Sequence, residues 1–276
     1  MHSIYHFFRH LVTNKRFFET IENIEIFPFD SAIVSCRNAG QFPDLAIKIN
    51  TSNALFTGGE LIELKDSKSY TVSSFNSTIP SGQKDIKKVI KNTNSSIKKQ
   101  MEEAGDNIYS LPNREVFYLV RGKSKGNVKI VLVHGSFFET IKTNSLISQS
   151  FEQVLEERLK EKGLDVGKDI KDLLVDIFSE QDSFSKVRSV DKASVKLRFR
   201  IMTEVKAEGN ILNTQKYPQI KANTISLIVP RHTKKDEELA LKRFSAIYSE
   251  STIKQFEIFN IKHLLNGYFT VFQRNM

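Results

Sequence analysis

Two short stretches point most directly to the fold of this chain: Pro43-Asp-Leu-Ala-Ile-Lys-Ile49 and Gly58-Gly-Glu-Leu-Ile-Glu-Leu-Lys65. Residues 45–49 and 61–65 are rich in Leu and Ile, a composition typical of strands. The segment between them contains Asn, Ser and Gly, which favour a chain reversal. We therefore expect an antiparallel hairpin built from these two strands.

Charged side chains gather at one corner of the expected hairpin. Glu63 and Lys65 share one face of their strand, and apolar neighbours take the other face. Asp44 directly precedes the partner strand, so closing the hairpin brings its carboxylate near that of Glu63. Because Mg²⁺ takes oxygen ligands and acidifies water for phosphodiester hydrolysis, Asp44 and Glu63 are candidate ligands. Lys65 is a candidate for orienting that water or stabilising charge on the phosphorus.

Pro43-Asp44 followed by Glu63-Leu64-Lys65 resembles the motif of the PD-(D/E)XK nuclease superfamily. The resemblance implies that Asp44 and Glu63 bind Mg²⁺ and that Lys65 is the catalytic lysine of a DNA nuclease. It also implies an α+β or α/β fold, with a mixed central β-sheet flanked by helices, as in restriction endonucleases. The match covers residues 43–65, and some superfamily members add an acid from a preceding helix, here Glu19 or Glu22.

Two other interpretations of these acids are open. Glu63 and Lys65 could form an ordinary solvated pair, with Asp44 capping a turn. Glu204 and Lys206 repeat the acid-lysine spacing, with Asp191 upstream, but residues 195–201 alternate without a turn residue. At ~3.3 Å per residue, Asp191 and Glu204 would lie about 40 Å apart, too far to share a metal ion.

The charge balance favours a polyanionic partner. The 276 residues contain 41 Lys and Arg against 32 Asp and Glu, a net charge of +9. The single cysteine, Cys36, excludes an intrachain disulfide and a cysteine zinc cluster. No apolar run approaches the ~18 residues of a membrane span, so we expect a cytoplasmic protein that has no contact with a membrane.

Two basic segments are candidates for contacting double-stranded DNA. Apolar residues at helical spacing after Pro80 predict a basic amphipathic helix that carries Lys84, Lys87 and Lys88. Further along, basic side chains alternate with apolar ones and predict a strand with one basic face, formed by Lys196, Arg198 and Arg200. Arginines can read guanine, whereas lysines on phosphates only position a duplex.

The remaining pattern predicts one domain over residues 1–276, with a catalytic core near 1–140 and DNA-contacting and dimerisation elements in 141–276. Helices are expected at 5–24, 147–159, 170–177 and 237–248, and strands at 115–121, 127–134, 194–205 and 223–229. The apolar segment 256–272 shows no period that assigns it.

The sequence therefore predicts a Mg²⁺-dependent type II restriction endonuclease that cuts double-stranded DNA at a short site. A homodimer is expected, because symmetric sites need two active sites. One alternative is a structure-selective DNA repair nuclease that uses the same residues. The other is a non-catalytic nucleic-acid-binding protein in which the basic segments alone act.

Overall fold

The computed structural model describes residues 34–36, 42–49, 58–72, 75–76, 80–90, 96–139, 143–179, 186–190, 193–196, 202–203 and 207–276. The chain divides into two compact units. The first comprises residues 1–73, 80–138 and 204–276, and the second comprises residues 74–79 and 139–203. All three expected catalytic residues belong to the first unit.

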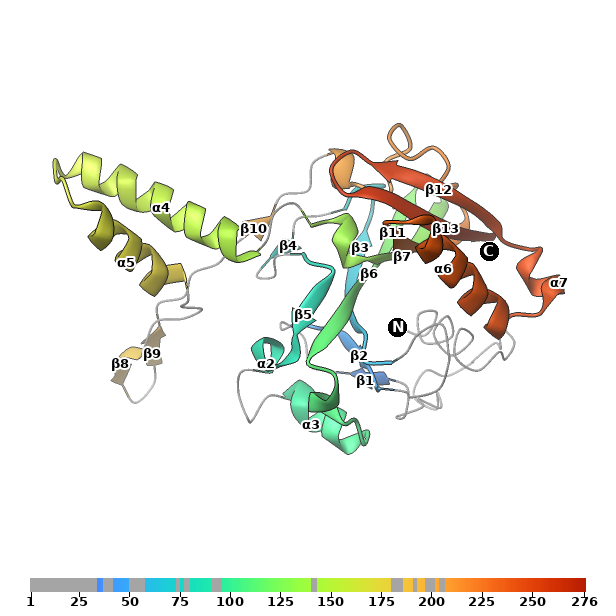
Figure 1. The fold of residues 1–276 in the computed structure, drawn as a ribbon, viewed down its shortest axis with the longest axis horizontal. Helices are drawn as coiled ribbons and strands as arrows, with labels where there is room; N and C mark the ends of the chain where they lie inside the picture. Colours follow the sequence, from blue (N-terminus) through green and yellow to red (C-terminus); the bar gives the residue numbers. More distant parts are fainter. Residues whose placement is uncertain are drawn as a thin grey trace. The chain divides into compact units, whose positions relative to one another are not determined.

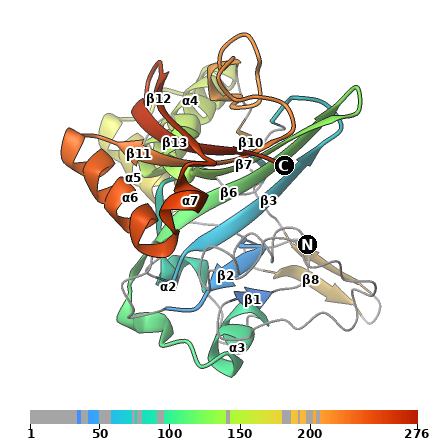
Figure 2. The same ribbon diagram turned by 90° about the vertical axis from the view of Figure 1, so that its right-hand side faces the viewer.

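A mixed β-sheet forms the centre of the first unit (Figure 2). In spatial order its strands are β1 (Val34–Cys36), β2 (Leu45–Ile47), β3 (Leu61–Ser67), β6 (Asn113–Ser124), β7 (Asn127–His134), β11 (Thr224–Arg231), β13 (Gly267–Asn275) and β12 (Glu257–His263). The short strand β5 (Gln83–Asp85) also pairs with β6. β3 and β6 are parallel, as are β7 and β11, and the other neighbours are antiparallel.

Helices accompany this sheet, which confirms the expected mixed α/β class. In the first unit they are α2 (Ile86–Val89), α3 (Ser96–Glu103), α6 (Lys234–Ile247) and α7 (Glu250–Ile253). Thr233 and Asp236 form a capping box that starts α6. α6 lies against the β11 and β13 region (Figure 1), where Phe244 stacks on Phe272 with ring centroids 4.4 Å apart.

Both faces of the central strands are buried. Ile62, Phe117, Leu132 and Leu227 belong to the core cluster on the α6 side of the sheet. Leu61, Val116, Tyr118, Val131 and Val133, which alternate with that side, are also inaccessible to solvent. Burial on both faces explains why β6 and β7 read as nearly continuous apolar runs.

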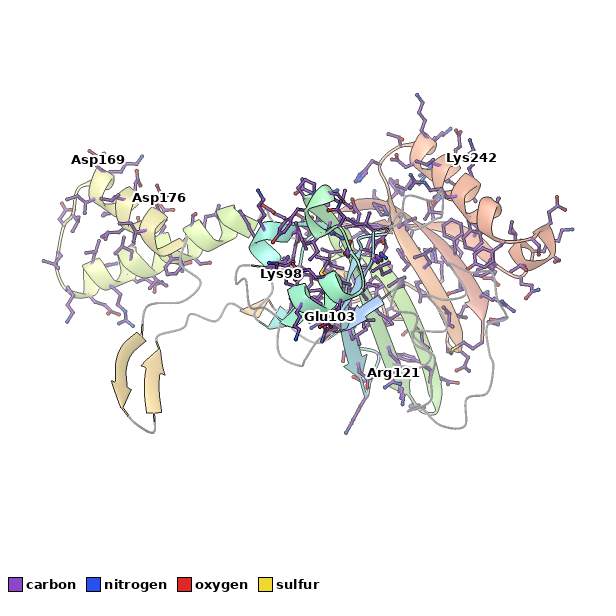
Figure 3. The ribbon with its side chains drawn as sticks, turned by 90° about the horizontal axis from the view of Figure 1, so that it is seen from below. Lys98, Glu103, Arg121, Asp169, Asp176 and Lys242 are labelled. Atoms are coloured by element: carbon purple, nitrogen blue, oxygen red, sulfur yellow. The ribbon has the colours of Figure 1, made fainter. Side chains whose placement is uncertain are left out.

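The second unit contains a helical hairpin and two small strand pairs. α4 (Thr143–Glu161) and α5 (Lys168–Ser179) confirm the two expected helices. Asp169 and Asp176 are exposed side chains of α5 (Figure 3). β8 (Lys186–Val190) pairs with β9 (Ala193–Lys196), and β4 (Phe75–Asn76) pairs with β10 (Met202–Thr203).

Most expected elements of the described part are present, with two differences. Residues 256–272, which no pattern assigns, form most of β12 and β13. The expected helix after Pro80 begins only at Ile86, so Lys84 lies on a strand. The expected helix at 5–24, with Glu19 and Glu22, lies outside the described residues. Within the described part, no helix is long and apolar enough to span a bilayer.

Candidate active site

Asp44 and Glu63 come together across the β2–β3 hairpin. The strands pair with Leu45 opposite Ile62, and this register continued by one residue sets Asp44 opposite Glu63. The Asp44 carboxylate accepts a hydrogen bond from the Leu64 backbone N–H at 2.8 Å. The expected hairpin is therefore confirmed, and the Asp44 carboxylate lies at the peptide that joins Glu63 to Leu64.

Lys65 belongs to the same corner. Its ammonium nitrogen lies 3.3 Å from Oε1 of Glu63, and the Lys65 and Glu63 side chains are only 17% and 16% exposed. Charges shielded from water in this way interact more strongly than a fully solvated pair. Two carboxylates and one ammonium group, with a net charge of −1, thus lie on one face of the hairpin.

A buried ion pair supports the hairpin from its closed end. Nη1 of Arg114 lies 3.5 Å from Oδ2 of Asp106, and both side chains are inaccessible to solvent. Arg114 also donates to the Gly59 carbonyl at 3.3 Å, while Asp106 accepts from the Ile49 N–H at 3.3 Å. Ile49 and Gly59 are the two ends of the segment that closes the hairpin, so the pair holds both of them.

Arg114 is surrounded by backbone acceptors. It donates to the Ile108 carbonyl at 2.7 Å and to the Leu111 carbonyl at 3.0 Å. Burial lowers the pKa of Arg114, although the Asp106 carboxylate opposes that shift. Gly59, with φ +89°, packs so closely that an added Cβ would lie 2.8 Å from Nη1. A larger residue there would displace the guanidinium from the hairpin.

The predicted basic helix is partly wrong. The Asp85 side chain accepts from the Lys87 N–H and so caps α2, which leaves Lys84 before the helix, on β5. The Lys84 ammonium lies 5.3 Å from the centroid of the Phe42 ring, two residues before Asp44. Lys87 and Lys88 are exposed on α2, as expected. Lys84 therefore differs from the other two lysines because it packs beside the segment that carries Asp44.

The predicted basic strand is described only in part. Lys196 is the last residue of β9, which pairs with β8 in the second unit. Arg198 and Arg200 lie outside the described residues, as do Asp191, Glu204 and Lys206 of the rival acid-lysine site. The assignment of these basic residues to DNA stays a prediction.

A histidine network on β6 and β7 has no counterpart among the sequence motifs. Nε2 of His134 lies 2.6 Å from Glu115, and Nδ1 lies 2.8 Å from the Ser136 hydroxyl. Burial raises the pKa of Glu115, but hydrogen bonds from His134 and Gln83 outweigh it, and the pKa is lowered. His134 Nδ1 also accepts from the Ser136 N–H and caps the turn at 135–137. Both the backbone N–H and the hydroxyl of Ser136 therefore contact His134, which joins this turn to Glu115 on β6.

Asp44 and Glu63 fit a hard divalent cation by their chemistry, since both offer carboxylate oxygens on one face of the hairpin. Mg²⁺ usually keeps several waters and uses one or two protein carboxylates, so a two-acid site suffices. Among the described residues, no group of three or more His, Cys, Asp or Glu side chains is arranged to hold a metal.

Comparisons with family models, with curated proteins and with solved structures gave no match to this chain. The interpretation of the site therefore rests on its own residues and geometry.

Proposed function

We propose that this chain is a Mg²⁺-dependent endonuclease that cuts double-stranded DNA, of the type II restriction kind. The observation that supports it most is the hydrogen bond from the Leu64 N–H to the Asp44 carboxylate. This bond joins the two halves of a motif that lie 20 residues apart in sequence. It brings the second acid of the motif to the strand that carries the acid-lysine pair.

Asp44 and Glu63 would hold the cation, which when bound neutralises phosphate charge and acidifies water. The two carboxylates with Lys65 leave a net charge of −1, which favours a divalent cation over an empty site. The Leu64 N–H fixes the Asp44 side chain, and the Lys65 ammonium fixes that of Glu63. Both carboxylates are thus oriented by the chain itself, as preorganised ligation requires.

Lys65 is the residue that would act on the scissile phosphate. Its side chain is largely shielded yet not fully buried, so a phosphate oxygen can approach the ammonium group. There it would stabilise the negative charge that develops on the phosphorus oxygens or orient the attacking water. Lys84, beside Phe42, adds a second cation near the segment that carries Asp44 and is a candidate contact to the DNA backbone.

One incubation separates this proposal from its alternatives. The full chain is mixed with long double-stranded DNA and Mg²⁺, and with EDTA as the control. Discrete fragments that require Mg²⁺ are expected for a restriction endonuclease. A smear, or cleavage confined to branched substrates, would indicate a repair nuclease. Intact DNA with a salt-sensitive mobility shift would indicate a non-catalytic binder. Sedimentation of the free protein tests the expected homodimer separately.

A further inference from the structure

Two leucines project into solvent at the end of the β12–β13 hairpin. Leu264 and Leu265 are 73% and 69% exposed, the largest values among the exposed large apolar side chains of the described residues. They lie in the turn between His263, the last residue of β12, and Gly267, the first residue of β13. Residues 263–267 are called here the β12–β13 tip. Exposed apolar side chains that stand together call for an explanation, because a solvated leucine contributes no burial.

The β12–β13 tip is built to hold these leucines in place. Nδ1 of His263 accepts hydrogen bonds from the Leu265 N–H at 3.2 Å and the Asn266 N–H at 3.0 Å. His263 is itself buried, and its ring packs on that of Phe137 with the ring centroids 4.8 Å apart. The Asn266 side chain donates to the Phe137 carbonyl at 2.9 Å. The turn is therefore fixed to the body of the sheet, and the leucines are preorganised outside it.

Cations and an aromatic ring border the leucines. The Tyr268 ring is 46% exposed, with the Lys262 ammonium 5.7 Å and the Arg231 guanidinium 5.8 Å from its centroid. Arg231 also pairs with Glu237 at 2.5 Å, so Lys262 supplies most of the uncompensated charge. Residues 262–268 contain Lys262 and no Asp or Glu. Glu208, which acts on His263 from outside the hairpin, pairs with Lys216 at 3.0 Å. Exposed leucines beside a lysine fit a ligand that presents negative charges on its outside and apolar surfaces within.

We propose that the β12–β13 tip is a wedge whose leucines insert between stacked base pairs of duplex DNA. Leucine is among the apolar residues that proteins use to unstack and kink a duplex, and Lys262 would contact the adjoining phosphates. The inference rests on the proposed function, since it takes DNA as the ligand. A second copy of the chain fits less well, because two leucines are few against the ~800 Å² per partner of a stable interface.

The experiment measures unstacking and affinity without cleavage. Wild-type protein is bound to long duplex DNA with Ca²⁺ replacing Mg²⁺, and permanganate reports unstacked thymines. The test variant is Leu264→Ser/Leu265→Ser. The matched control is Leu239→Ser on α6, which changes another exposed leucine. Leu265→Phe is the conservative variant, because phenylalanine is also a wedge residue.

We expect the wild type, Leu239→Ser and Leu265→Phe to produce permanganate-reactive thymines, and the double variant to produce none. The double variant should bind about tenfold or more weakly, because serine side chains cannot pack against the unstacked bases as the leucines do. Its slope of log affinity against log salt should stay unchanged, whereas Lys262→Ala should lower that slope by about 0.9.

Several results would overturn the wedge. The double variant could bind as tightly as the wild type and leave the same thymines reactive. Alternatively, the two leucines could be needed for binding phosphatidylserine vesicles or for dimer formation in sedimentation, which would assign the tip to a membrane or to a second copy. If the wild type cleaves DNA in Mg²⁺ but shows no reactive thymines, only the wedge fails. If it neither binds nor cleaves DNA, the proposed function fails with it.

Discussion

Two hairpins of one sheet, β2–β3 and β12–β13, share the same backbone pairing and differ in their charge and exposure. The first carries Asp44, Glu63 and Lys65, and its Glu63–Lys65 ion pair is mostly shielded from water. The second carries no carboxylate from Ile258 onward and holds its two leucines in solvent. Antiparallel pairing therefore sets where the side chains lie, and the residue types determine what each hairpin can do.

The two hairpins are also held in different ways. A buried charge pair, Asp106 with Arg114, fixes both ends of the segment that closes β2–β3. A neutral imidazole, His263, fixes the shorter turn of β12–β13. Since a charge pair and an imidazole respond to mutation and to pH differently, each hairpin can be disturbed without the other.

The largest effect is expected from removing the acids of β2–β3. Asp44→Ala and Glu63→Ala should each lower the cleavage rate at least about 10³-fold, because charge neutralisation by a bound metal is worth several kcal/mol. Binding measured in Ca²⁺ should persist. Asp66→Ala is the matched control, since Asp66 is an exposed acid of the same strand that pairs with Arg121 at 2.7 Å. A rate within about threefold of wild type for either acid variant would contradict the site.

The next largest effect concerns the ion pair beneath that hairpin. Arg114→Leu should lower the free energy of unfolding by about 3–5 kcal/mol, because Asp106 would remain as an uncompensated buried charge. Urea unfolding measures the change. The double variant Arg114→Leu/Asp106→Leu should recover part of the loss. A double variant as unstable as the sum of the two single variants would show that the pairing contributes nothing.

Sequence patterns predict the hairpin because it is local. Pro43-Asp44, the Asn, Ser and Gly between the strands, and the alternation around Glu63 all lie within 23 residues. The ion pair has no such signal, since Asp106 and Arg114 meet only through tertiary packing around residues 49 and 59.

Other differences between pattern and structure have equally physical causes. The pattern places Lys84 on a helix because Lys84 stands next to the lysine run that follows Ile86, although no apolar side chain lies between Pro80 and Ile86. In the structure the Asp85 cap ends the strand and begins the helix at Ile86. Residues 256–272 escape assignment because β13 has consecutive buried residues on both faces, so no alternation marks it as a strand.

A smaller effect is expected at Lys65. Lys65→Ala should slow cleavage by about 10²-fold while DNA binding in Ca²⁺ is retained, because the ammonium acts on charge that develops in the transition state. Single-turnover rates at saturating protein measure this step. Lys68→Ala, an exposed lysine beyond β3, is the control and should cleave at the wild-type rate. Equal losses in the two variants would show that general basicity, and not the position of Lys65, matters.

The smallest effect is expected at the β12–β13 tip on acidification. Burial lowers the pKa of His263, although Glu208 opposes the shift, so the folded state favours the neutral ring. His263 therefore stabilises the fold fully above the unfolded-state pKa of about 6.5, and this contribution falls as the pH drops below that value.

Protonation of Nδ1 would also remove the acceptor for two backbone N–H groups of the turn. Hydrogen exchange at Leu265 and Asn266 should accelerate as the pH falls below about 6.5, beyond its intrinsic pH dependence, while the β2–β3 amides are unaffected. His263→Gln should lose this pH dependence, and the surface variant His232→Gln should keep it. If the wild type and His263→Gln change in parallel with pH, the imidazole does not hold the turn.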